Sequence, residues 1–292
     1  MTAFFCDSNC ELWWETANSL GIKNIIKMPY TISGEEKFYD LGKDYDAKDF
    51  FDKIRKGNIP ITSALNPENY KEYFEPFFKA GEDIFYVSFS SEMSATFKYM
   101  DMAVAELSKT YPDVKFTRYD TKGISLSAGL LVYIAAKAHN EGKSTDEIIA
   151  LLDTLKNYTN CSIVVDDLQH LKRGGRLSGF QAFAGGMLNI KPIIKLSKLG
   201  TLFSAAKVMG RNKAFATIAD EIIADAANTA YPIAIMDADC RAESDRIAQK
   251  IKAALPDVEI WQQSVGPVIG THCGPGTIGI CYIGNKERPD NL

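Results

Sequence analysis

Hydrophobic and polar positions in the first half of the chain alternate between two spacings. Short apolar runs of strand length occur at 3–7, 24–28, 84–89 and 115–120. Between them, apolar residues recur with helical spacing at 11–20, 97–107 and 128–138. Strands that alternate with helices are typical of βαβ units, so this pattern predicts a mainly parallel sheet covered by helices.

Two helix-start signals lie in the same half of the chain. Asn66 directly precedes Pro67, and asparagine at the N-cap with proline at the first helical position is a typical start. This predicts a helix from Pro67 to Gly81, with 60–66 as a loop leading into its N-terminus. Ser144 is expected to cap a further helix.

The pattern changes after Cys161. We expect a strand in SIVVDD, a basic glycine-rich loop in LKRGGRLSG, a hairpin turning at Leu199 and Gly200, and a final strand in TIGICYIG. Further strands are expected at 233–236 and 258–262, and further helices at 213–227 and 244–255. The fold class is therefore α/β, with residues 1–158 as an N-terminal, mainly parallel α/β domain and 159–292 as a C-terminal α+β domain.

Composition excludes several classes of protein. The chain has 292 residues, 46% of them hydrophobic and 24% charged, which is typical of a globular protein with an ordinary core. Its formal net charge of -4 argues against a nucleic-acid partner. The six cysteines form no CxxC pair, and the three histidines are not spaced as metal ligands, so no metal or other cofactor is expected. No membrane span or signal peptide is evident, and a cytoplasmic location is expected.

Hydroxyl groups gather where predicted strands or loops lead into helices. Thr62 and Ser63 precede the helix at Pro67, and Ser91 and Ser94 follow the strand at 84–89. Helix N-termini and the carboxyl ends of parallel strands are typical anion and ligand sites. Serine and threonine also make ordinary turns, and Ser94 could serve only as a helix cap.

Two later segments carry side chains suited to a carboxylate. Arg173 and Arg176 lie in LKRGGRLSG, where the alternative is a solvated surface turn. His272 lies in the glycine-rich GPVIGTHCGPGTIGI, whose formal GxGxxG match is followed by a strand-like run and so fails as a dinucleotide site. Neither a P-loop nor a GxSxG elbow is present, and the acidic pairs at 166–167 and 237–239 are expected to end strands on the solvent side.

Taken in order, these segments resemble the DegV family along essentially the whole chain. The matching stretches are CDSNC with its Asp7–Ser8 pair, TS at Thr62, SSEMSAT, DTKGISLSAG, LKRGGRLSG with the following IKPII, and THCGPGTIG. The chain departs from the family's TSQPS, which is TSALN here, and from its SGT, which is SAT. Both departures bear on chain preference and affinity.

The resemblance implies a non-enzymatic protein that binds a long-chain fatty acid, such as palmitate or oleate, between its two domains. It places the carboxylate near Thr62 and Ser94. By the same resemblance, Ser63, Ser91, Arg173 and His272 lie close to the head group, and a separate fatty acid kinase is an expected partner in lipid metabolism or transport. Apolar segments at 130–136 and 180–188 are candidates for lining the acyl tunnel.

Two other classes of function remain open at this point. One is a small-molecule hydrolase or transferase with His272 as its base and Ser94 or Cys273 as its nucleophile. The other is a regulatory sensor in which ligand binding changes a protein contact. Loss of turnover with lipid binding intact in a His272→Ala variant would favour the enzyme.

Overall fold

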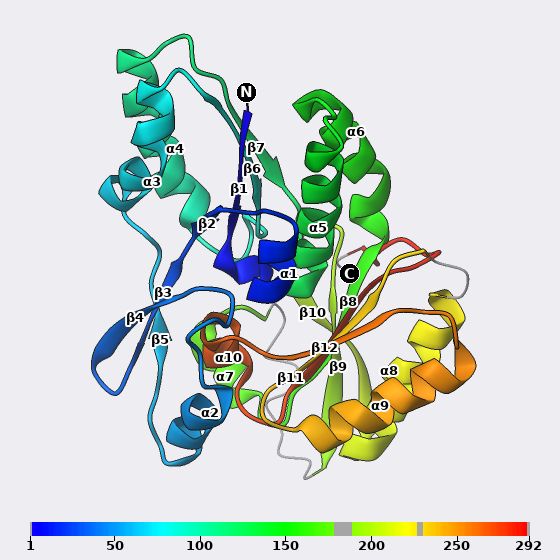
Figure 1. The fold of residues 1–292 in the computed structure, drawn as a ribbon. Helices are drawn as coiled ribbons and strands as arrows, with labels where there is room; N and C mark the ends of the chain where they lie inside the picture. The colour runs from blue at the N-terminus through cyan, green and yellow to red at the C-terminus, as the bar shows by residue number, and fades with distance from the viewer. Residues whose placement is uncertain (1, 178–188, 227–229, 291–292) are drawn as a thin grey trace. The chain divides into compact units, whose positions relative to one another are not determined.

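The computed structural model describes residues 2–177, 189–226 and 230–290, and contacts divide the chain into two compact units (Figure 1). The first unit comprises residues 1–45 and 61–156, and the second comprises 46–60 and 157–292. Segment 46–60 therefore groups with the later part of the chain. The expected division into domains at 1–158 and 159–292 stays a prediction.

A parallel four-stranded sheet forms the centre of the first unit. Its strand order is β2-β1-β6-β7, and every neighbouring pair is parallel. The strands are β1 (Thr2–Asp7), β2 (Asn24–Ile26), β6 (Asp83–Ser88) and β7 (Phe116–Asp120). The helices of this unit are α1 (Trp14–Ser19), α3 (Pro67–Lys79), α4 (Thr96–Thr110), α5 (Leu126–Asn140) and α6 (Thr145–Leu155). The predicted parallel α/β arrangement is confirmed.

Aromatic side chains fill the core between this sheet and α3. Phe5 of β1 meets Phe74 of α3 edge to face, with ring centroids 5.4 Å apart, and both are fully buried. Burying a phenylalanine contributes about 1.5–3 kcal/mol through the removal of apolar surface from water. The buried apolar side chains of β1 and α3 therefore fix the helix against the strands whose ends carry the site.

Short elements of the first unit differ from the sequence-based expectations. A 3-10 turn (Ser8–Cys10) precedes α1, which is shorter than the helix expected at 11–20. A separate antiparallel sheet, β4-β3-β5, contains β3 (Met28–Ile32), β4 (Glu35–Tyr39) and β5 (Ile61–Thr62). The expected loop at 60–66 was therefore wrong at its start, because Ile61 and Thr62 pair with β3.

The second unit contains a six-stranded mixed sheet with the order β10-β9-β8-β13-β11-β12. The strands are β8 (Thr159–Val164), β9 (Ile190–Leu196), β10 (Leu202–Met209), β11 (Ile233–Asp237), β12 (Ile260–Ser264) and β13 (Ile278–Ile283). Only β11 and β12 pair in parallel among these described strands. The α+β character and the β9–β10 hairpin are confirmed.

Two long helices, α8 (Arg211–Asp225) and α9 (Arg241–Ala254), cover one face of this sheet (Figure 1). Their buried residues, including Ile222 and Ile251, pack against Ile235 and Ile280 of the strands. The short helices of the unit are α2 (Ala47–Arg55), α7 (Gln169–Gly174) and α10 (Pro267–Cys273), and a 3-10 turn (Lys156–Tyr158) precedes β8. No helix in the described ranges is long and apolar enough to cross a membrane.

Three expectations for the second unit were wrong. The supposed glycine-rich loop at 171–179 begins inside α7, and its residues 178 and 179 lie outside the described ranges. His272 lies in α10 and not in a turn. Asp237 ends β11 but is buried with 1% of its surface exposed, so it does not face solvent. The candidate tunnel segment at 180–188 also lies outside the described ranges.

Candidate functional site

The carboxyl end of β1 is joined to that of β6 by the buried carboxylate of Asp7. Its oxygens accept hydrogen bonds from the Tyr86 hydroxyl at 2.7 Å, the Phe89 amide at 3.2 Å and the Asn9 amide at 2.9 Å. Burial raises the pKa of Asp7, and these three hydrogen bonds oppose the rise. Asp7 thus holds the start of the segment that contains Ser91 and Ser94.

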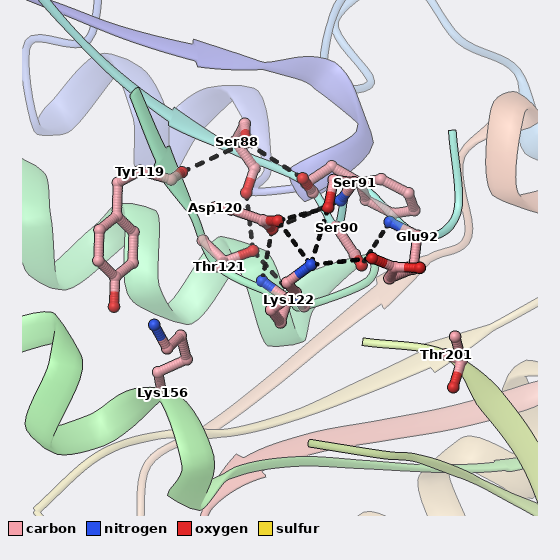
Figure 2. Close-up of polar contacts among 12 residues, drawn as sticks. Ser88, Ser90, Ser91, Glu92, Tyr119, Asp120, Thr121, Lys122, Lys156 and Thr201 are labelled. Carbon is pink, nitrogen blue, oxygen red and sulfur yellow. Dashed lines mark hydrogen bonds and ion pairs between the residues drawn. The ribbon is translucent and has the colours of Figure 1, made fainter. Parts of the chain in front are cut away.

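A second carboxylate holds the same segment against the end of β7. The Ser91 hydroxyl donates to Asp120 Oδ2 at 2.6 Å and accepts from Lys122 Nζ at 2.8 Å. Lys122 Nζ also lies 3.1 Å from a carboxylate oxygen of Asp120 and 3.1 Å from one of Glu92 (Figure 2). Within the first unit the Ser91 hydroxyl therefore already donates one hydrogen bond and accepts another. Its geometry suits an anchor for the loop better than a direct carboxylate ligand.

The next hydroxyl pair lies at the N-terminus of α4. Ser94 Oγ is 2.7 Å from Thr96 Oγ1, and either atom can donate in that contact. Ser94 Oγ also accepts from the Thr96 amide at 3.3 Å. The N-cap position itself is Ala95, which makes no side-chain cap. Ser94 is therefore partly exposed just ahead of a helix N-terminus, with a hydroxyl proton that can be redirected to a ligand.

Thr62 and Ser63 precede the N-terminus of α3. Thr62 is the partly exposed last residue of β5, and Ser63 is exposed. The helix begins with the expected cap: Asn66 Oδ1 accepts from the Asn69 amide at 3.0 Å, and Asn69 Oδ1 accepts from the Asn66 amide at 3.3 Å. Asparagine in TSALN thus supplies a complete capping box.

The N-terminal turns of α3 and α4 are neighbours within the first unit. The two helices pack together. Burial raises the pKa of Tyr70, in the first turns of α3, while contact with the hydroxyl of Thr96, the first residue of α4, acts in the opposite direction. Each helix N-terminus carries about half a positive charge from its aligned peptide dipoles. Two such termini, with Thr62 and Ser94 ahead of them, can stabilise one anion.

The other expected site residues, Arg173 and His272, belong to the second unit, where their helices α7 and α10 pack together. Exposed Arg173 has its Nη2 3.1 Å from His170 Nδ1. A Cβ atom built at Gly174 would overlap the imidazole of His272, so this glycine permits the close approach of the two helices. The structure therefore brings Arg173 and His272 into one local cluster.

His272 is held in its neutral form. Burial, with a further contribution from the nearby charge of Arg176, lowers the pKa of His272 to about 4. At neutral pH the imidazole can donate one hydrogen bond and accept another, and it carries no charge to pair with a carboxylate. The guanidinium groups of Arg173 and Arg176 are the permanent cations in this cluster.

The loops that carry the expected site residues of the first unit are organised by three further side chains, those of Asp7, Asp120 and Lys122. These three were not among the expected site residues. Two of them were detectable, because Asp7 and Asp120 end predicted parallel strands of one sheet, where ligand-site residues gather. The described ranges contain no group of three or more histidine, cysteine or acidic side chains placed to hold a metal ion.

Solved fatty-acid-binding proteins share this fold. It combines a parallel sheet, with hydroxyl-bearing loops at its strand ends, and a mixed six-stranded sheet that follows in sequence. A protein of Thermus thermophilus, described as a DegV family protein with fatty acid binding, matches at 27% identity with a TM-score of 0.82, covering 96% of this chain and 98% of that one. DegV of Bacillus subtilis, described as a fatty acid binding protein, matches at 28% identity with a TM-score of 0.79 and the same coverage.

Sequence comparison gives the family. The family model described as "Uncharacterised protein, DegV family" matches residues 1–285. A DegV domain-containing protein of Clostridium perfringens is 34% identical over 286 residues, which is 98% of each chain. This chain belongs to the DegV family, as its motifs indicated.

Proposed function

We propose that this protein binds a long-chain fatty acid, such as palmitate or oleate, and holds its carboxylate with the hydroxyls of Thr62 and Ser94. The observation that carries the proposal is the pair of neighbouring helix N-termini, those of α3 and α4, which these two residues precede. The likeness to solved relatives described as fatty-acid-binding proteins supports the ligand class.

The chemistry of the head group fits these partners. A carboxylate removed from water needs hydrogen bonds to each oxygen, or it takes up a proton. Thr62 and Ser94 supply hydroxyl donors, and the positive ends of two helices favour the negative charge. Ser63, Arg173 and His272 are assigned to the surroundings of the head group. Ser91 is assigned there as the residue that anchors the Ser94 loop to Asp120.

The acyl chain supplies most of the driving force for binding. Each buried CH₂ group contributes about 0.8 kcal/mol, so a chain of about sixteen carbons gives a large gain even after the entropy lost on association. Residues 130–136 of α5, an apolar helix buried along most of its length, are proposed to line part of the tunnel.

We further propose that the protein is a carrier without catalytic activity of its own. In this role it presents the fatty acid to a separate fatty acid kinase in the cytoplasm, for lipid metabolism or transport, and the kinase supplies nucleotide and metal. In this proposal the carboxylate is held directly by hydroxyls and helix ends and not by an ion pair, which suits a head group that a partner enzyme must reach.

The enzyme alternative with His272 as base is less well supported. A histidine with a pKa of about 4 is a weak base at neutral pH. Cys273, the next residue on α10, has its buried thiol 3.8 Å from the Gly274 carbonyl oxygen that it faces. Consecutive helix residues also project about 100° apart, so His272 is poorly placed to activate this thiol.

The test is a direct titration of delipidated protein with palmitate and with oleate. The double variant Thr62→Ala, Ser94→Ala should weaken binding at least about tenfold, because a buried carboxylate would lose two donors. The control variant is Thr154→Ala, which removes an exposed hydroxyl bonded only locally, to the Leu151 carbonyl, and it should bind as the unmodified protein does. Unchanged affinity in the double variant would refute the assigned carboxylate site.

A further inference from the structure

Two cysteine thiols face each other in the middle of the six-stranded sheet. Cys161 of β8 and Cys281 of β13 are directly opposite residues of an antiparallel pair. Their sulfur atoms are 3.4 Å apart, and the two side chains are buried, with 4% and 1% of their surfaces exposed. Both are thiols in the structure, as are the other four cysteines.

The backbone at this position already has the geometry that a disulfide needs. Opposite residues in antiparallel strands have Cα atoms about 4.5 or 5.5 Å apart, depending on their hydrogen-bonding register. Disulfides span Cα separations of about 4.4–6.8 Å, so either register is compatible with a bond. Because the sulfurs start 3.4 Å apart and a disulfide bond measures about 2.05 Å, side-chain rotation is enough to close it.

We propose that Cys161 and Cys281 form a peroxide-sensitive dithiol that closes to a disulfide across β8 and β13. One thiol loses its proton and the resulting thiolate attacks hydrogen peroxide. The O–O bond breaks, the sulfur becomes a cysteine sulfenic acid, and the leaving hydroxide takes up the released proton as water. The second thiol then attacks the sulfenic sulfur, the S–S bond forms, and hydroxide leaves with the thiol proton as a second water. Two thiols and one peroxide give one disulfide and two waters, with both sulfurs oxidised and the peroxide reduced.

Hydrogen peroxide is the oxidant that this burial allows. A bulky disulfide reagent would have to form a mixed disulfide inside the sheet, where both side chains are almost completely enclosed. Peroxide is close to water in size and leaves no group attached to the protein after the second step. Its access depends on local opening of the sheet, so slow oxidation is expected.

The position of the pair links it to the cluster in the second unit. Strand β8 leads into α7, which carries Arg173, and β13 follows α10, which carries His272. A covalent bond between these strands would restrain the two segments that support both helices. The inference does not depend on fatty-acid binding, because it rests on the thiol geometry alone.

The remaining cysteines provide an internal comparison. Cys6 and Cys10 are fully buried neighbours in the first unit, where the side-chain hydrogen bond to Cys10, followed by burial, raises the pKa of the Cys6 thiol. A high thiol pKa disfavours the thiolate that peroxide oxidation requires. If geometry did not matter, peroxide would produce disulfides at both Cys6–Cys10 and Cys161–Cys281. The proposal predicts a disulfide at Cys161–Cys281 alone.

The experiment treats the reduced full-length protein with increasing hydrogen peroxide, alkylates remaining thiols after denaturation, and maps unreduced peptides by mass spectrometry. We expect the loss of two hydrogen atoms, a cross-linked peptide pair containing Cys161 and Cys281, and reversal by dithiothreitol. The variant Cys161→Ser should lose this product, and the control Cys6→Ser should retain it. Because the bond closes a long loop, the oxidised protein should melt at least about 4 °C higher, and only when Cys161 is present.

Two outcomes would overturn the proposal. In one, Cys161 and Cys281 both remain alkylatable at peroxide exposures that fully oxidise an added small thiol. In the other, the disulfide recovered joins other cysteines, or survives unchanged in Cys161→Ser.

Discussion

Replacing Asp120 with alanine should destabilise the first unit more than an ordinary surface carboxylate would. Its side chain accepts from the Ser91 hydroxyl at 2.6 Å and from the Lys122 amide at 2.9 Å, and it lies 3.1 Å from Lys122 Nζ. The substitution removes these three interactions and also the hydrogen bond that Asp120 Oδ1 accepts from the Ser91 amide at 3.4 Å. It also leaves Lys122 with Glu92 as its remaining charged partner in this cluster.

The size of the effect follows from the number and kind of these contacts. Hydrogen bonds to charged groups contribute about 1.5–3 kcal/mol each. The Asp120 side chain is 21% exposed, so solvent screening reduces the contribution of the ion pair. Taking two charged hydrogen bonds at the lower end of their range gives a loss of about 3 kcal/mol in the free energy of unfolding.

The assay is urea denaturation of Asp120→Ala beside the control Asp101→Ala. Asp101 pairs with Arg118 at 2.6 Å but is 59% exposed, so its removal should cost less than about 1 kcal/mol. Asp120→Ala should also speed amide hydrogen exchange in residues 90–95, since their loop loses its anchor. A stability loss equal to that of Asp101→Ala, with unchanged exchange in the loop, would refute the anchoring role of Asp120.

Two further predictions follow, one for each unit. Gly129→Ala should lower the free energy of unfolding by about 1–3 kcal/mol, because its Cβ would overlap the backbone oxygen of Cys10 and force a shift between α5 and the Ser8–Cys10 turn. Thermal melting checks this, and a variant that melts normally would contradict it. His272 binds no proton in the folded protein until its pKa of about 4, whereas the unfolded chain takes one up near 6.5, so stability should fall as pH drops from 6.5 to 4 by up to about 3 kcal/mol. Burial also lowers the pKa of His139, so His139→Gln should flatten this part of the stability profile as well, but less than His272→Gln does; equal profiles for the two variants would contradict the assignment.

Buried strands and amphipathic helices were predictable from sequence because their own residues determine them. The apolar runs of β1 and β6 and the capped start of α3 needed no knowledge of the rest of the chain. Strand β5 was missed because it has only two residues, Ile61 and Thr62, and exists through pairing with β3 far away in sequence. No local pattern distinguishes such a pairing from a loop.

The helices that carry Arg173 and His272 were missed although signals for them were present. Gly175 has a left-handed backbone with a φ of 65° and ends α7, which is the usual role of glycine after a helix. Pro267 occupies the start of α10, where proline is favoured. Both glycine-rich stretches were interpreted as loops, while the glycines in fact mark where short helices end.

The positions of the candidate hydroxyls relative to helices were predictable from sequence, whereas the contacts that hold their loops were not. Thr62 and Ser94 were assigned from the resemblance to the DegV family, and the structure puts both ahead of the N-termini of α3 and α4. That they bind the carboxylate stays a prediction. That Ser91 is engaged by Asp120 and Lys122 depends on three-dimensional contacts between separate loops. Such contacts leave no periodic signal in the sequence.

Denaturing mass spectrometry of the organic extract from purified protein tests the central claim most directly. We expect a saturated or monounsaturated long-chain fatty acid at about one molecule per chain, restored after delipidation by incubation with palmitate or oleate. An extract without fatty acid, from a protein that also takes up neither palmitate nor oleate, would contradict the proposed function.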